Sequence, residues 1–146
     1  MTIEKILFPT DFSETAVRTA AYAADLAKRH GAKVYLLHVI YDISGDSGWY
    51  GSHLNMDSIY DDVKKSAEAE LDRIARAFPD GIEVERVLRI GRPHEDIVAY
   101  AKEAGIDMIV IGSHGRKVIG RVLFGSTAQR VVRRASCPVL TVRDRA

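Results

Sequence analysis

The sequence predicts an α/β fold in which an open, five-stranded, mostly parallel sheet carries helices on both faces. Three observations indicate it. Strand-like and helix-like patterns alternate along the 146 residues in the order βαβαβαβαβ, which is typical of parallel sheets with right-handed crossovers. Several strand patterns are nearly continuous in apolar residues, as strands buried on both faces are. No repeat, low-complexity tract or linker interrupts the alternation, so we expect residues 1–146 to form a single domain.

The chain opens with a strand, a helix and a second strand. The first strand covers residues 3–8, and Asp11 then offers an N-cap for a helix, with Glu14 three residues on as in a capping box. The helix carries a stripe of small residues, which permits close approach to a sheet, and Gly31 ends it. The members of this stripe are Ala16, Ala20, Ala23, Ala24 and Ala27. Residues 33–40 form the second strand, which is almost continuously apolar.

The middle of the chain holds a loop, the longest helix and a strand. Tyr41 to Asn55 is rich in Gly, Ser and aromatic residues, which suits either a cover for a ligand or dimer partner or a plain surface loop. Residues 59–78 have helical periodicity, and residues 82–87 alternate apolar and polar, as a half-exposed strand near a sheet edge does. Pro93 then suits the first turn of a helix that Gly105 ends.

The last part of the chain adds two strands and a helix. A buried strand over residues 107–111 leads through a loop into a helix over residues 127–135, and a final strand runs from Pro138 to Val142. The final strand belongs at an edge of the sheet and is apolar. It therefore predicts a symmetric homodimer in which this strand pairs with the same strand of a second copy.

The loop between residues 111 and 127 has the composition of a phosphate cradle. Glycines after a strand allow positive φ and bring amide groups close to a ligand, and a helix start adds unpaired N–H donors. The spacing is Gly112-x2-Gly115-x9-Gly125-Ser126, with Arg116 and Lys117 between. Taken singly, the glycines also suit turns, and Ser126 also suits a capping box with Gln129. Their conjunction favours the phosphate site.

Four stretches of this chain together resemble the universal stress protein family. They are the glycine motif, Lys5 to Ser13, Leu37 to Val39, and Cys137 to Val142. The resemblance implies an adenine nucleotide alpha hydrolase-like, Rossmann-like sheet with strand order 3-2-1-4-5. In that order the ends of the first and fourth strands flank the ligand crevice.

The resemblance also implies a ligand and its contacts. The ligand is ATP, with Mg²⁺ or Mn²⁺ carried on its phosphates rather than held by protein side chains. The implied phosphate contacts are Gly112, Gly115, Gly125 and Ser126, with Ser113, His114, Arg116 and Thr127 as neighbours. The implied nucleoside contacts are Pro9, Thr10, Asp11 and the backbone of Val39. Asp11 is also a candidate helix cap, and both roles stay open because a carboxylate has two oxygens.

Composition excludes several classes of protein. The chain is 47% hydrophobic and 28% charged, as folded globular proteins are. A single cysteine, Cys137, excludes an internal disulfide, and no apolar run approaches the ~18 residues of a membrane-spanning helix. The first residues contain no apolar signal region, so we expect a cytoplasmic protein.

The net charge of +1 conceals an asymmetry. Residues 112–146 carry a net +7, from eight Lys or Arg against Asp144 alone, and residues 1–111 carry −6. This pattern suits a polyanionic ligand near the C-terminal third, a solvated basic helix face, or a nucleic-acid surface.

No catalytic constellation accompanies the expected nucleotide site. The loop lacks the Lys-Ser/Thr pair of a Walker A motif, the histidines lack zinc-site spacing, and His38 is expected in the core. We therefore expect an ATP-binding, nucleotide-responsive regulatory or interaction module with an unidentified protein partner. One alternative is a slow ATPase or an autophosphorylating enzyme with Ser126 or Thr127 as acceptor. A less favoured one is a nucleic-acid binder acting through the basic C-terminal third.

Overall fold

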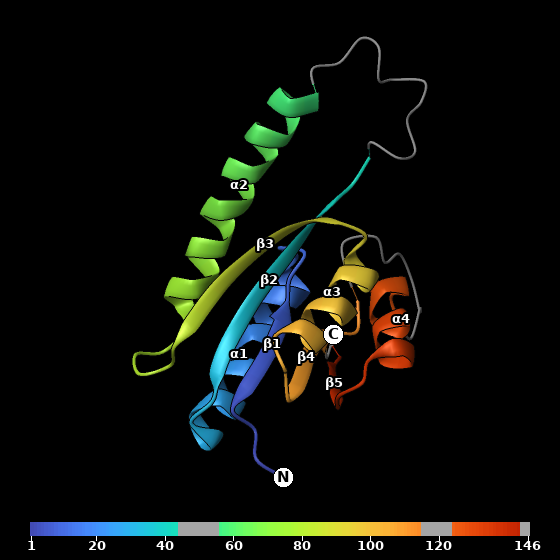
Figure 1. Ribbon diagram of the computed structural model, residues 1–146. Helices are drawn as coiled ribbons and strands as arrows, with labels where there is room; N and C mark the ends of the chain where they lie inside the picture. Colours follow the sequence, from blue (N-terminus) through green and yellow to red (C-terminus); the bar gives the residue numbers. More distant parts are fainter. Residues whose placement is uncertain (44–55, 115–123, 144–146) are drawn as a thin grey trace.

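The computed structural model describes residues 1–43, 56–114 and 124–143 and has the predicted α/β architecture (Figure 1). Its five strands form one sheet in which every neighbouring pair is parallel, in the order β3-β2-β1-β4-β5. This order confirms the one that the family resemblance implied. The elements in chain order are β1 (Lys5–Pro9), α1 (Glu14–His30), β2 (Lys33–Tyr41), α2 (Met56–Ala77), β3 (Val84–Gly91), α3 (Pro93–Glu103), β4 (Met108–Gly112), α4 (Ser126–Arg134) and β5 (Val139–Val142).

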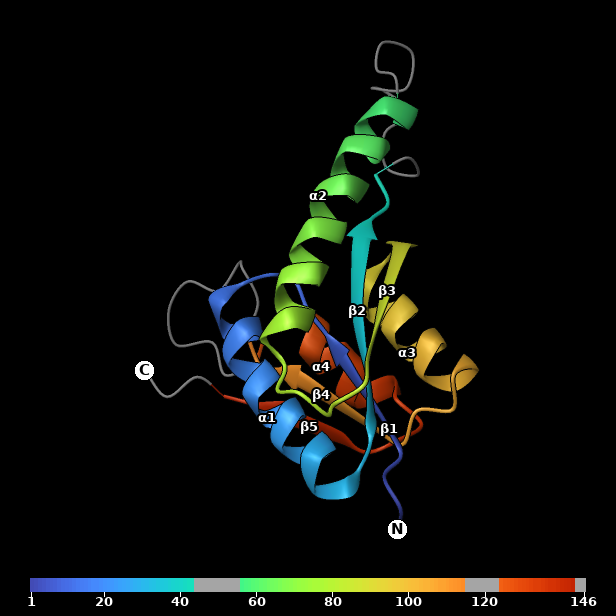
Figure 2. The same cartoon turned by 90° about the vertical axis from the view of Figure 1, so that its left-hand side faces the viewer.

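Helices cover both faces of the sheet. The two perpendicular views show α1 and α2 on one face and α3 and α4 on the other (Figure 1, Figure 2). Strand side chains alternate between faces, so Ile6 and Phe8 enter the core under α1 and α2, and Leu7 enters the core under α3 and α4. Both faces of β1 and β2 are therefore buried, which explains their continuous apolar patterns.

The alanine stripe of α1 packs against the sheet as predicted. Ala23 and Ala27 are almost completely buried, and the helix ends at Gly31, whose φ of 65° is the left-handed conformation that glycine adopts without strain. The predicted cap at Asp11 is wrong. Ser13 is the N-cap, and its hydroxyl accepts a hydrogen bond from the Ala16 amide at 3.2 Å. The helix starts later than predicted because residues 10–13 turn the chain out of β1.

The capping box that Ser126 and Gln129 also suited does not form at the last helix. Gly125 is the N-cap of α4, and Ser126 is its first helical residue, so the Ser126 side chain lies one position too late to form the box with Gln129. The Gln129 amide donates instead to the Gly125 carbonyl at 3.0 Å.

The sheet edges are β3 and β5, where sequence patterns predicted edge strands. The β5 side chain of Leu140 is 37% exposed. Of the predicted loop from Tyr41 to Asn55, residues 44–55 lie outside the described part of the chain. Across the three described ranges, no helix is both long enough and apolar enough to cross a membrane.

A topological switch point lies between β1 and β4. These strands are neighbours, with Ile6 opposite Met108 and Leu7 opposite Ile109, but α1 follows β1 on one face while α4 follows β4 on the other. The connections therefore diverge at the carboxyl ends of the two strands. In open parallel sheets ligands bind at this place.

Candidate functional site

A cleft of about 820 Å³ opens at the carboxyl ends of the strands. Its walls come from the ends of β1, β2 and β4 and the first turns of α3 and α4. The predicted site residues that line it are Pro9, Thr10, Asp11, Val39, Gly112, Ser113, His114, Gly125, Ser126 and Thr127. The fold thus gathers into one cleft every predicted site residue that the structure describes. Gly115 and Arg116 were also predicted, and they lie outside the described residues.

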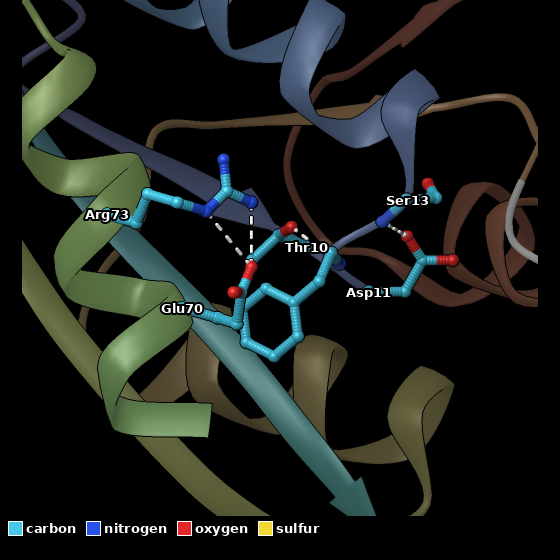
Figure 3. Close-up of polar contacts among 6 residues, drawn as sticks. Thr10, Asp11, Ser13, Glu70 and Arg73 are labelled. Carbon is cyan, nitrogen blue, oxygen red and sulfur yellow. Dashed lines mark hydrogen bonds and ion pairs between the residues drawn. The ribbon is translucent and has the colours of Figure 1, made fainter. Parts of the chain in front are cut away.

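The β1–α1 turn is held by two side-chain hydrogen bonds and contains a strained residue. The Thr10 hydroxyl accepts a hydrogen bond from the Phe12 amide at 3.0 Å, and the Asp11 carboxylate accepts one from the Ser13 amide at 3.0 Å (Figure 3). Phe12 has a φ of 65°, which is unfavourable for a residue with a side chain. Such strain costs on the order of 1 kcal/mol and is typical of functional sites. The turn therefore holds Asp11 in one place at the mouth of the cleft.

His38 supports this turn from the neighbouring strand. Its Nδ1 lies 2.7 Å from the Thr10 carbonyl oxygen, and its ring stacks on Phe12 with centroids 4.1 Å apart. A carbonyl only accepts, so Nδ1 carries the hydrogen. The prediction of a core histidine is wrong, because His38 is half-buried and lines the cleft. β2 is buried in its middle but opens to the cleft at its carboxyl end.

The two ends of the predicted phosphate loop meet at the cleft. The Gly125 amide donates to the Ser113 carbonyl at 2.6 Å. The Gly125 amide is therefore not a donor for a bound anion. The amides of Ser126, Thr127 and Ala128 precede the first α4 amide with a helical partner, so they are the donors that this helix start offers to an anion.

Gly112 serves packing rather than an unusual backbone angle. Neither Gly112 nor Gly125 has a positive φ, which corrects that part of the prediction. A Cβ at Gly112 would lie 3.1 Å from Thr19 Oγ1 and 3.3 Å from Thr15 Cγ2. The absence of a side chain thus lets α1 approach the end of β4.

Ser113 and His114 form a polar pair in the cleft floor. Ser113 is fully buried, and its Oγ lies 2.9 Å from His114 Nδ1. The serine hydroxyl is thus engaged with the His114 ring, and His114 is the more exposed member of the pair.

Sequence reasoning missed the wall that α3 and α4 contribute. Arg92, Pro93, His94 and Arg130 all line the cleft. A signal was available for each part of this wall. Gly91 ends a parallel strand, so the residues after it lie at the carboxyl ends of the strands, as Asp11 does. Arg130 follows Ser126 by one helical turn on the same face of α4.

The cleft combines apolar surface with polar and cationic groups. Leu37, Val39, Ile97 and Ile111 provide apolar surface, and Asp11 provides a carboxylate. The helix amides at Ser126, together with Arg92 and Arg130, provide positive potential. An apolar slot beside anion donors suits a nucleoside with attached phosphates, and the volume suits such a ligand. Among the described residues no group of three His, Cys, Asp or Glu is placed to hold a metal ion.

Comparison with known proteins gives consistent matches. The model of the universal stress protein family matches residues 2–143. Universal stress protein MJ0577 of Methanocaldococcus jannaschii is 31% identical over 96% of this chain and 94% of its own, and a solved structure of MJ0577 superposes with a TM-score of 0.87 over 100% of this chain and 99% of that one.

Two further solved structures hold nucleotides. A universal stress protein from Archaeoglobus fulgidus in complex with dAMP is 28% identical, with a TM-score of 0.64 over 97% of this chain and 98% of that one. A universal stress protein in complex with cAMP is 23% identical, with a TM-score of 0.70 over 98% of both chains, and shares the fold.

Proposed function

The chain belongs to the universal stress protein family, and we propose that it binds an adenine nucleotide, ATP foremost, in the cleft at the carboxyl ends of its strands. The observation that carries this proposal is the convergence of the β1–α1 turn, the end of β2 and the start of α4 on one cleft of about 820 Å³. The dAMP complex of the Archaeoglobus relative supports the ligand class.

The cleft divides into a nucleoside end and a phosphate end. In this proposal the nucleoside lies against Pro9, Thr10 and Val39, and the Asp11 carboxylate accepts hydrogen bonds from its hydroxyl or amino groups. The phosphates lie on the amides of Ser126 and its two successors, which precede the first amide with a partner within α4. Mg²⁺ or Mn²⁺ travels on the phosphates. Gly115 remains a predicted phosphate contact, and Arg116 remains a predicted neighbour of the phosphates.

Binding at this place suits a regulatory or interaction module. The phosphates contact both ends of the loop that the Gly125–Ser113 hydrogen bond brings together. A ligand that favours one arrangement of this surface shifts the population toward it, and a partner protein reads the result. The edge strand β5, with Leu140 exposed, pairs with its counterpart in a second copy to give a homodimer.

Calorimetric titration with ATP tests the binding proposal, with adenosine and tripolyphosphate as partial ligands. We expect saturable binding of one ATP per chain, tighter than either fragment, because both ends of the cleft contribute. Mass spectrometry of the freshly purified protein identifies any nucleotide that copurifies. Absence of heat with millimolar ATP, in protein shown to be nucleotide-free, would refute the proposal.

A further inference from the structure

A cationic wall stands on the side of the cleft that α3 and α4 form. Arg92 and His94 lie at the start of α3, and Arg130 lies one turn into α4. All three line the cleft, and the two helices pack against each other. The wall therefore belongs to the cleft and adds charged side chains to the amides that begin α4.

The charge of this wall is largely uncompensated. Within the described ranges, the ion pair of Arg92 is a long contact of 4.0 Å with Glu95, and Arg130 has none. Arg134 on α4 adds to the positive potential that His94 experiences. Several like charges along a concave wall attract anions and repel cations.

His94 is placed to respond to an anion in the cleft. Its side chain is only 12% exposed, and burial, followed by the charge of Arg130, lowers its pKa below the ordinary value. Arg134 and Arg92 act in the same direction, and Glu95, whose carboxylate lies 3.7 Å away, opposes them. The lowered pKa favours the neutral form of the ring.

Other titratable groups also border the cleft. From β1 and its turn comes Asp11, from β2 comes His38, and from the end of β4 comes His114. A test of His94 must therefore compare a His94 variant with the natural chain, because both share these groups.

We propose that Arg92, His94 and Arg130 form a second anion subsite, which recognises a phosphate group of the bound adenine nucleotide. The inference rests on the proposed function and adds a contact that the helix start alone does not supply. A phosphate at this wall offsets the arginine charges and raises the pKa of His94, so the complex takes up a proton. Affinity is then highest below the pKa of free His94 and declines as pH rises through the pKa of the bound state.

Proton uptake measured with ADP tests the subsite. The enthalpy of ADP binding is measured at pH 7 in buffers of different ionisation enthalpy. The slope of the binding enthalpy against the buffer ionisation enthalpy gives the number of protons taken up. We expect uptake by the natural chain, loss of part of it in His94→Gln, and no change in His30→Gln, at the end of α1 remote from the cleft. The ligand phosphate itself titrates near pH 6, so the difference between variants isolates His94.

Arg130→Gln provides a second readout that does not depend on titration. We expect ADP affinity to fall about tenfold, as for loss of one charge-assisted contact, and adenosine affinity to stay within about twofold. The subsite would be overturned, with nucleotide binding left intact, by equal proton uptake in His94→Gln and the natural chain. It would also be overturned if Arg130→Gln lowered the affinities for ADP and for adenosine by the same factor. Failure of the natural chain to bind ADP would overturn both.

Discussion

Asp11 and Ser13 carry out separate tasks in the turn that leaves β1. The Ser13 hydroxyl caps α1, and the Asp11 carboxylate accepts from the Ser13 amide through one oxygen while lining the cleft. From the sequence either residue is a plausible cap, because both have short side chains with acceptor oxygens. The structure decides between them, because the Ser13 hydroxyl accepts from the Ala16 amide within the helix, whereas Asp11 accepts from the Ser13 amide before it.

Asp11→Asn and Ser13→Ala separate these tasks experimentally. The amide side chain of the first variant keeps an acceptor for the Ser13 amide but loses the charge and half of the acceptor capacity. We therefore expect about tenfold weaker ATP binding, with stability changed by less than ~0.5 kcal/mol. Ser13→Ala removes the cap and costs about 1 kcal/mol of unfolding free energy. Calorimetry and urea denaturation measure the two effects. Equal ATP affinity in Asp11→Asn and the natural chain would contradict the assigned role of Asp11.

Gly112 illustrates a residue whose role the sequence reveals only in part. A glycine after a buried strand predicted a special position, and the structure gives a different reason for it, namely the approach of Thr15 and Thr19 on α1. Contacts between distant segments do not appear in a local pattern. The functional grouping of Gly112 with Ser126 was available from spacing, but its packing partner was not.

Gly112→Ala is expected to destabilise the fold by about 1–2 kcal/mol. The added methyl group would crowd Thr19 Oγ1, which cannot move easily because it donates to the Thr15 carbonyl at 2.7 Å. Urea denaturation measures the change. In the double variant Gly112→Ala, Thr15→Ser, removal of the Thr15 methyl group should recover part of the loss. If Gly112→Ala had the same unfolding free energy as the natural chain, α1 would have room for a methyl group at this position.

At the scale of elements, the sequence predicted every helix and strand, with ends that shifted by up to about four residues. The periodic patterns are long and consistent, so element type was clear, whereas ends depend on single capping interactions. The start of α4 shows the limit. From the sequence Ser126 suited either a phosphate contact or a cap, and the structure makes it the first helical residue and commits the Gly125 amide to Ser113.

This placement permits a sharp test of the α4 amides. Proline is well tolerated at a first helical position, and Gly125, with φ −69° and ψ 154°, already has the conformation required before proline. Ser126→Pro thus removes an amide donor without breaking the helix, and Ser126→Ala removes only the hydroxyl.

We expect Ser126→Pro to bind ATP about tenfold more weakly than Ser126→Ala, with thermal stability equal to within ~0.5 kcal/mol. Titration calorimetry measures the ATP affinity, and differential scanning calorimetry measures the thermal stability. Equal ATP affinity of the two variants would show that the phosphates do not lie on this amide.

At the scale of the whole molecule, the alternation of elements predicted the α/β class, and the family resemblance added the strand order. The contribution of α3 to the cleft was missed, although in a parallel sheet of order β3-β2-β1-β4-β5 the carboxyl end of β3 lies on the same side of the sheet as the carboxyl end of β1. Side-chain clusters such as Arg92 with Arg130 depend on how two helices pack. That packing is not encoded in any one segment.

The proposed homodimer is tested at the free edge of β5. Pro138 and Val142 accept hydrogen bonds from Ile109 and Ser113 of the β4 side, so the intervening Thr141 amide faces the free edge. Thr141→Pro keeps the β4 pairing and blocks addition of another strand. Light scattering should give a mass of about twice 16.2 kDa for the natural chain and for Thr141→Val, and about 16 kDa for Thr141→Pro. A mass equal to that of one chain for the natural protein would exclude the dimer.

The central claim is that an adenine nucleotide occupies the cleft at the switch point between β1 and β4. Two-dimensional ¹H–¹⁵N NMR during titration with ATP tests it most directly, because each backbone amide reports its own surroundings. We predict that the largest shifts occur at residues 10–13, 39, 112–114 and 126–128, with saturation at one ATP per chain. Shifts confined to other parts of the molecule, or no shifts at millimolar ATP, would contradict it.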